Sequence, residues 1–161
     1  MKKRLLSAAL ALALAVACLA GCGAASEEKT VAKALGLEKL PAVTHISSYD
    51  SHGGFHGDGI LTAVVKLPNS QAGENAVQSI AEQWKPLPIE EDWMEQFQSV
   101  WTDHGQTLGV LPQNTEGFWF YRDRYKERYG EVCYPNPVMQ NCTFAMLDTD
   151  SGVLYVLEVD C

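Results

Sequence analysis

The residues with the clearest chemical potential lie in the glycine-rich stretch 48–61, which reads SYDSHGGFHGDGIL. His52, His56 and Asp58 all occupy even-numbered positions, so an extended chain points their side chains to one face. Imidazole and carboxylate groups are established zinc ligands in proteins. The pattern therefore predicts a zinc-type metal site formed by these three residues.

The spacing of these residues leaves other interpretations open. His56 and Asp58 lie about 6.6 Å apart along a strand, which side chains can bridge, but His52 and His56 lie about 13 Å apart. Only a bend at one of the intervening glycines brings His52 within reach of the other two side chains. Glycine permits such a bend because it tolerates positive φ. The alternatives are a backbone connection with solvated histidines, other polar ligand contacts, or an acid–base pair of His56 and Asp58 in a small envelope hydrolase.

A second group with binding chemistry follows the aromatic stretch GFWFYRDRY at residues 117–125. Arg122, Asp123 and Arg124 form a charged cluster that can meet a carboxylate or phosphate on a partner. The partner is then an unidentified protein, glycan or small molecule. The alternative is a solvated strand end whose charges pair internally.

Recognised catalytic and nucleotide-binding motifs do not occur in the sequence. There is no G-x-S-x-G elbow, P-loop or dinucleotide glycine pattern. The stretch starting at Asp148 begins like a calcium loop, but position twelve would be Val159 instead of a carboxylate. We therefore expect a binding module and not an enzyme, with metal binding and hydrolysis as the alternatives.

The elements that must position these residues follow from apolar periodicity. Residues 42–49 and 60–67 have strand character, and the glycine-rich stretch joins them as a hairpin. The spacing predicts helices over 72–84 and 90–100, because apolar residues recur on one helical face. Further strands are expected at 117–125, 142–148 and 153–160, and a long loop at 122–142.

This order of elements predicts the fold class. Hairpins without alternating βαβ units indicate an antiparallel sheet. We expect an α+β domain with about five strands and one or two helices packed on one face. In the last strand, Val153 and Leu157 share one face, and Leu154 and Val156 share the other.

The N-terminal segment has the features of a secretory signal. Residues 2–4 are basic, residues 5–19 are apolar, and the run is shorter than the ~20 residues of a membrane-spanning helix. The ending Leu19-Ala20-Gly21-Cys22 resembles the lipobox of bacterial lipoproteins. That resemblance implies cleavage before Cys22, acylation of its sulfur with chains such as palmitate, and anchoring at the extracytoplasmic face of the cell membrane.

The predicted organisation is a signal peptide at 1–21, a lipidated tether at 22–34 and a single domain at 35–161. After removal of residues 1–21, 9 basic and 20 acidic residues remain, a net charge of −11 with histidine neutral. Such a domain repels nucleic acid and anionic lipid, which argues against DNA, RNA and peripheral lipid binding.

Three cysteines remain besides Cys22, so at most one disulfide can form within the domain. Cys133 and Cys142 are the better pair, because Pro135 and Pro137 lie between them and can turn the chain back. An unstrained bond of this loop length contributes about 2–3 kcal/mol.

Several stretches taken together resemble a group of uncharacterised lipoproteins of clostridial-type bacteria. The stretches are the lipobox, SHGGFHGDG, WKPLP, GFWFYRDR and FAMLDTDSGVLYVLE, and they cover most of the domain. The resemblance implies a Gram-positive cell surface and contributes no catalytic residues.

Overall fold

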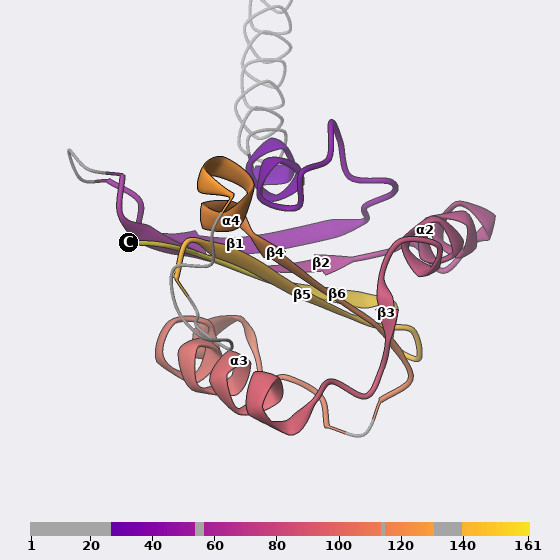
Figure 1. Ribbon diagram of the computed structural model, residues 1–161. Coiled ribbons are helices and arrows are strands. Elements are labelled where there is room, and N and C mark those ends of the chain that lie inside the picture. The colour runs from indigo at the N-terminus through magenta and orange to yellow at the C-terminus, as the bar shows by residue number, and fades with distance from the viewer. Residues whose placement is uncertain (1–26, 54–56, 114, 131–139) are drawn as a thin grey trace, which may run out of the picture.

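The computed structural model describes residues 27–53, 57–113, 115–130 and 140–161. In these ranges the chain forms an α+β domain built on a six-stranded antiparallel sheet (Figure 1). The strand order is β1-β2-β6-β5-β4-β3. The antiparallel α+β class predicted from the order of hairpins is confirmed.

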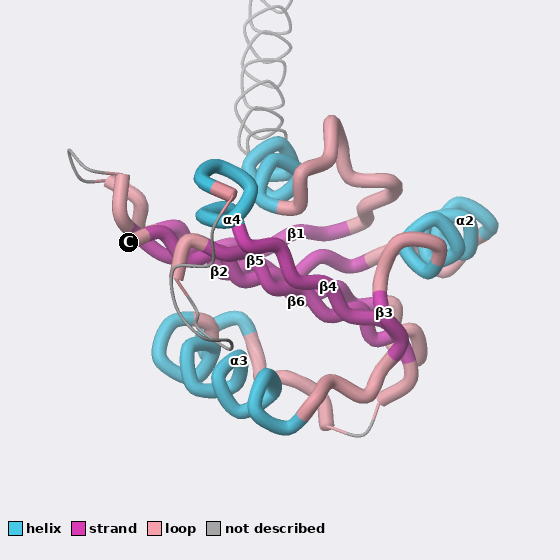
Figure 2. Tube along the Cα trace, in the orientation of Figure 1, coloured by secondary structure: helices cyan, strands magenta, loops and turns pink. Residues whose placement is uncertain are grey.

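The predicted strands and the two predicted helices are present, together with elements that were not predicted (Figure 2). Residues 27–34 are helical. The elements that follow are β1 His45–Asp50, β2 Gly59–Lys66, α2 Gln71–Ala81, β3 Lys85–Pro86, α3 Glu91–His104, the 3-10 turn η1 Gln106–Leu108, β4 Gly117–Asp123, α4 Arg124–Tyr129, β5 Cys142–Asp148 and β6 Val153–Asp160. Both predicted hairpins, β1–β2 and β5–β6, pair in antiparallel register.

The sheet buries an apolar cluster on each of its two faces. The face covered by α3, here called the α3 face, holds an aromatic cluster that includes Phe97, Trp119 and Phe144. The opposite face, here called the α4 face, packs against helix 27–34 and α2 and also carries α4 (Figure 1). The expectation of helices on one face is therefore corrected to helices on both.

The physical reason for this two-sided cover lies in β6. Leu154 and Val156 join the cluster of the α4 face, whereas Leu157 and Val159 join that of the α3 face. A central strand with apolar side chains on both faces must be covered on both, because exposed apolar surface is unfavourable in water.

The tether predicted at 22–34 is corrected for its second half. Residues 27–34 form a helix, and Val31, Ala32 and Leu35 are buried in the cluster of the α4 face. These three residues recur at i, i+1 and i+4, a helical spacing that the polar composition of the segment had masked. Within the described residues, the domain therefore begins by residue 27.

The long loop predicted at 122–142 contains a short helix, α4. Asp123 caps its start by accepting a hydrogen bond from the Lys126 backbone N–H at 2.8 Å. Gly130 ends it with φ of 75°, a left-handed conformation that favours glycine. Residues 131–139, which include Cys133, lie outside the described residues.

Candidate functional site

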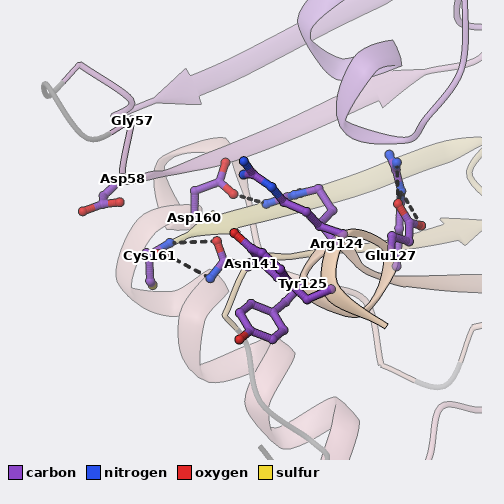
Figure 3. Close-up of a pocket in the computed structure, with 11 residues that line it drawn as sticks. Gly57, Asp58, Arg124, Tyr125, Glu127, Asn141, Asp160 and Cys161 are labelled. Carbon is purple, nitrogen blue, oxygen red and sulfur yellow. Dashed lines mark hydrogen bonds and ion pairs between the residues drawn. The ribbon is translucent and has the colours of Figure 1, made fainter. Parts of the chain in front are cut away.

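Two predicted segments far apart in sequence meet around one pocket of about 660 Å³ (Figure 3). Gly57 and Asp58, at the end of the glycine-rich stretch, line one part of it, and residues of α4 line another. Asn141 and the end of β6 supply further lining. The candidate surface predicted from the sequence combines the 52–58 loop with the 122–128 cluster, and residues of both line this pocket.

The centre of this region is the Arg124 guanidinium. It forms an ion pair with Glu158 Oε1 at 2.7 Å and donates to Thr143 Oγ1 at 2.6 Å and to Asp160 Oδ1. It also donates to the backbone carbonyls of Cys142 at 3.1 Å and Val159 at 2.8 Å. Arg124 therefore ties α4 to the ends of β5 and β6, and its donors are committed to the protein itself.

The alternation of side chains along β6 explains why the carboxylate partners of Arg124 lie on one face of the sheet. Glu158 and Asp160 share the parity of the buried residues Leu154 and Val156, so β6 carries an apolar face that ends in two carboxylates. Thr143 stands opposite Glu158 in the β5–β6 register and donates to the Ala34 carbonyl at 2.9 Å. The Arg124 network therefore also reaches the segment of helix 27–34.

Glu158 has a perturbed pKa in this network. Burial raises the pKa of its carboxyl above the ordinary value, and the neighbouring Asp160 acts in the same direction. Arg124 opposes this shift without cancelling it. The cluster therefore contains one carboxyl group that is harder to ionise than usual.

His52 connects the glycine-rich stretch to the same network. Its Nδ1 lies 2.6 Å from Asp50 Oδ1, and its Nε2 lies 3.2 Å from Asp160 Oδ2. The second contact is within ion-pair distance but lacks hydrogen-bond geometry. Gly59 permits this close crossing, since a Cβ there would lie 2.7 Å from the His52 backbone nitrogen.

The predicted zinc ligands are only partly described. His52 faces two carboxylates, Asp58 lines the pocket, and His56 lies outside the described residues. Among the residues that the structure describes, no three His, Cys, Asp or Glu side chains are grouped to hold a metal ion. The three-residue zinc site and the His56–Asp58 hydrolase pair stay predictions.

The predicted ligand contacts at 122–124 are held by internal partners. The Arg122 guanidinium donates to both Glu127 carboxylate oxygens at 2.7–2.9 Å, and these hydrogen bonds lower the pKa of Glu127. Asp123 caps α4, and Arg124 serves the network described above. The alternative of internal pairing at a strand end therefore describes these three residues.

The pocket lining extends beyond the predicted 122–128 cluster to Tyr129, which sequence reasoning missed. The rings of Tyr125 and Tyr129, one helical turn apart on α4, have centroids 4.6 Å apart. The Arg128 guanidinium lies 5.4 Å from the centroid of the Tyr129 ring, which is 57% exposed. The signals for α4 were present: an Asp cap, a glycine stop and tyrosines at i and i+4.

Asn141 holds Cys161 within the lining of the pocket. Its side-chain amide donates to the Cys161 carbonyl at 3.0 Å, and its amide oxygen accepts from the Cys161 N–H at 3.4 Å (Figure 3). Besides the two tyrosines, the lining contains six charged side chains, four of which form the ion pairs Arg122–Glu127 and Arg124–Asp160. Such a lining suits a polar ligand with a flat face better than an apolar one.

The predictions about cysteines and the membrane anchor fall largely outside the described ranges. Cys22 precedes residue 27, and Cys133, the predicted partner of Cys142, lies in 131–139. Cys142 itself is buried in β5. In the part of the chain that the structure describes, no helix has the length and apolar character needed to span a bilayer.

Comparisons with known proteins provide no relative from which the role of this site could be inferred. The chain matches no protein-family model, no curated protein and no solved structure. The functional argument therefore depends on the site itself.

Proposed function

We propose that this protein is a lipid-anchored, extracytoplasmic binding module that performs no catalysis. The basic start, apolar run and lipobox support acylation at Cys22. The single observation that supports ligand binding is the pocket in which the glycine-rich stretch meets α4.

The ligand class follows from what the pocket has left to offer. Arg122 and Arg124 are occupied by carboxylates of the protein, so the pocket is not a cluster of free cations suited to a highly charged anion. The exposed Tyr129 ring offers a face, and Arg128 and Asp58 offer single charges. We assign the site to a short glycan or a similar polar molecule of the cell envelope.

The test compares two exposed tyrosines. Tyr129 is 57% exposed and lines the pocket, whereas Tyr49 is 48% exposed and lies on the edge strand β1 away from it. The probes are muropeptides from enzymatically digested peptidoglycan and oligomers of N-acetylglucosamine. Binding to the mature chain in detergent micelles is followed by saturation-transfer NMR.

We expect Tyr129→Ser to weaken binding about tenfold, because stacking on an aromatic ring is lost, and Tyr49→Ser to leave it unchanged. No transfer with any of these probes would contradict the glycan assignment. An equal loss in both variants would contradict the location of the site.

Membrane anchoring is tested separately by growth with radioactive fatty acid. The wild type should incorporate label, and Cys22→Ala should not. Label retained in Cys22→Ala, or absent from the wild type, would contradict acylation at this residue.

A further inference from the structure

The charges of this acidic protein are distributed unevenly over its helices. The sequence of α3 contains four acidic residues and no lysine or arginine. That of α4 contains three basic residues and one acidic residue, and helix 27–34 carries Lys29 and Lys33 beside Glu27 and Glu28. The average charge of the chain, which argued against contact with anionic lipid, therefore does not describe these two helices.

The basic side chains of the α4 face are available to a partner. Lys29 and Lys33 on helix 27–34 and Lys126 and Arg128 on α4 are exposed and form no ion pair with another described residue. Helix 27–34 and α4 lie on the same face of the sheet (Figure 1), and Leu35 and Gly36, which follow the helix, line one pocket with Lys126 and Glu127 of α4. The two helices therefore belong to one outer layer.

An exposed apolar side chain accompanies these cations. Leu37 follows helix 27–34 and is 36% exposed.

The position of the lipobox cysteine places this layer next to the bilayer. Five residue steps separate Cys22 from Glu27, a reach of at most about 18 Å even when fully extended. An anchor this short holds the start of helix 27–34 close to the headgroups. The acidic α3 lies on the opposite face of the sheet (Figure 1).

We propose that Lys29, Lys33 and Lys126, with Leu37, form a surface that docks on anionic lipid headgroups, while Arg128 and Tyr129 belong to the pocket described above. Docking orients the domain with the α4 face toward the membrane and the acidic α3 face away from it. This inference rests on the acylation of Cys22 proposed above. Attraction between basic side chains and an anionic leaflet supplies the orientation, and repulsion of α3 reinforces it.

The experiment is a lysine footprint on the acylated mature chain. The protein is reconstituted into vesicles containing equal parts of phosphatidylglycerol and phosphatidylcholine, into vesicles of phosphatidylcholine alone, and into detergent. A water-soluble acetylating reagent is added, and the rate at each lysine is measured by mass spectrometry. Lys66 and Lys85, exposed on β2 and β3, are internal controls.

We expect acetylation of Lys29, Lys33 and Lys126 to slow at least threefold in the anionic vesicles relative to detergent. Lys66 and Lys85 should change little. High salt should remove most of the protection, because it screens exposed charges. In Lys29→Gln/Lys33→Gln, protection of Lys126 should fall while the protein stays bound through Cys22.

Two results would overturn the proposal and are distinguishable. Protein that does not stay with the vesicles would contradict the anchor, and with it the docking surface. Protein that stays but shows equal protection at all five lysines, or the same protection in both vesicle types, would contradict the surface alone.

Discussion

The two faces of the sheet are built on different physical principles. On the α3 face, Phe97 and Phe144 pack with ring centroids 4.3 Å apart, and Trp119 stacks on Phe144 at 5.6 Å. On the α4 face, the apolar cluster ends in the ionic network around Arg124. Apolar packing tolerates changes of pH and salt, whereas a partly exposed ionic network responds to both.

This difference suggests a division of labour. The aromatic face supplies most of the stability per residue, because large buried rings remove the most apolar surface from water. The network end supplies the pocket and the charges through which the protein can meet a ligand. Stability and binding should therefore respond to different substitutions.

The largest expected effect comes from the aromatic face. Phe97 is fully buried, so Phe97→Ala removes its ring from the cluster and leaves a cavity. We expect a loss of about 3–5 kcal/mol in the free energy of unfolding, measured by urea denaturation with circular dichroism. Val110→Ala, at a side chain that is 85% exposed, is the control and should change stability by less than about 0.5 kcal/mol. A loss below about 1 kcal/mol for Phe97→Ala would contradict the division.

A smaller effect is expected from the network. Arg124→Leu leaves Glu158 and Asp160 without their cation, and the Arg124 side chain is 20% exposed and Glu158 is 18% exposed. We expect a loss of about 2 kcal/mol, below the range for fully buried pairs because solvent still reaches these groups.

The matched control is Arg122→Leu. Arg122 also binds a carboxylate through its guanidinium, but its partner Glu127 is 51% exposed. The loss should be no more than about 1 kcal/mol. Equal losses for the two arginines in urea denaturation would show that the network has no special role.

The smallest effects concern pH, and two carboxyl groups should act in opposite directions. Burial opposes ionisation of Asp148, but hydrogen bonds from Ser151 and Thr115 outweigh it and lower its pKa below 3.8. Its contribution to the free energy of unfolding is present above pH 3.8 and is lost as pH falls through the folded-state pKa. In Asp148→Asn, stability should therefore depend less on pH below about pH 4 than it does in the wild type.

For Glu158 the sign is reversed. Burial raises its pKa above 4.5, so its contribution is present below that value and is lost as pH rises through the folded-state pKa. The wild type should lose stability as pH rises above 4.5, and Glu158→Gln should remove this loss. Thermal melts from pH 3 to pH 7 measure both limbs, and parallel shifts in the two variants would contradict the assignments.

Strand and helix positions could be predicted because alternation and helical periodicity are local properties of the sequence. In β4, Phe118 and Phe120 pack on the α4 face while Trp119 and Tyr121 pack on the α3 face, as the alternation predicted. Helix 27–34 was missed because charged residues surround its apolar positions. The short helix α4 was missed because its charges resembled those of a loop.

The site could be predicted only in part, because partner choice depends on the fold. The sequence singled out Arg122, Asp123 and Arg124 as charged, but not that Glu127, the helix cap and Glu158 would occupy them. It singled out His52, but not that Asp160, 108 positions away, lies beside its ring. Such long-range pairs follow from sheet register, which single-sequence patterns do not specify.

The central claim is that the pocket between the glycine-rich stretch and α4 binds the ligand. The most direct measurement is a two-dimensional ¹H–¹⁵N NMR titration of the mature chain in detergent micelles with purified muropeptides. We predict that the largest shifts map to Asp58, Tyr129 and Asn141, with α3 unaffected. The largest shifts at Met94 and Gln98, which line an apolar pocket of about 270 Å³ on the α3 face, would contradict the claim.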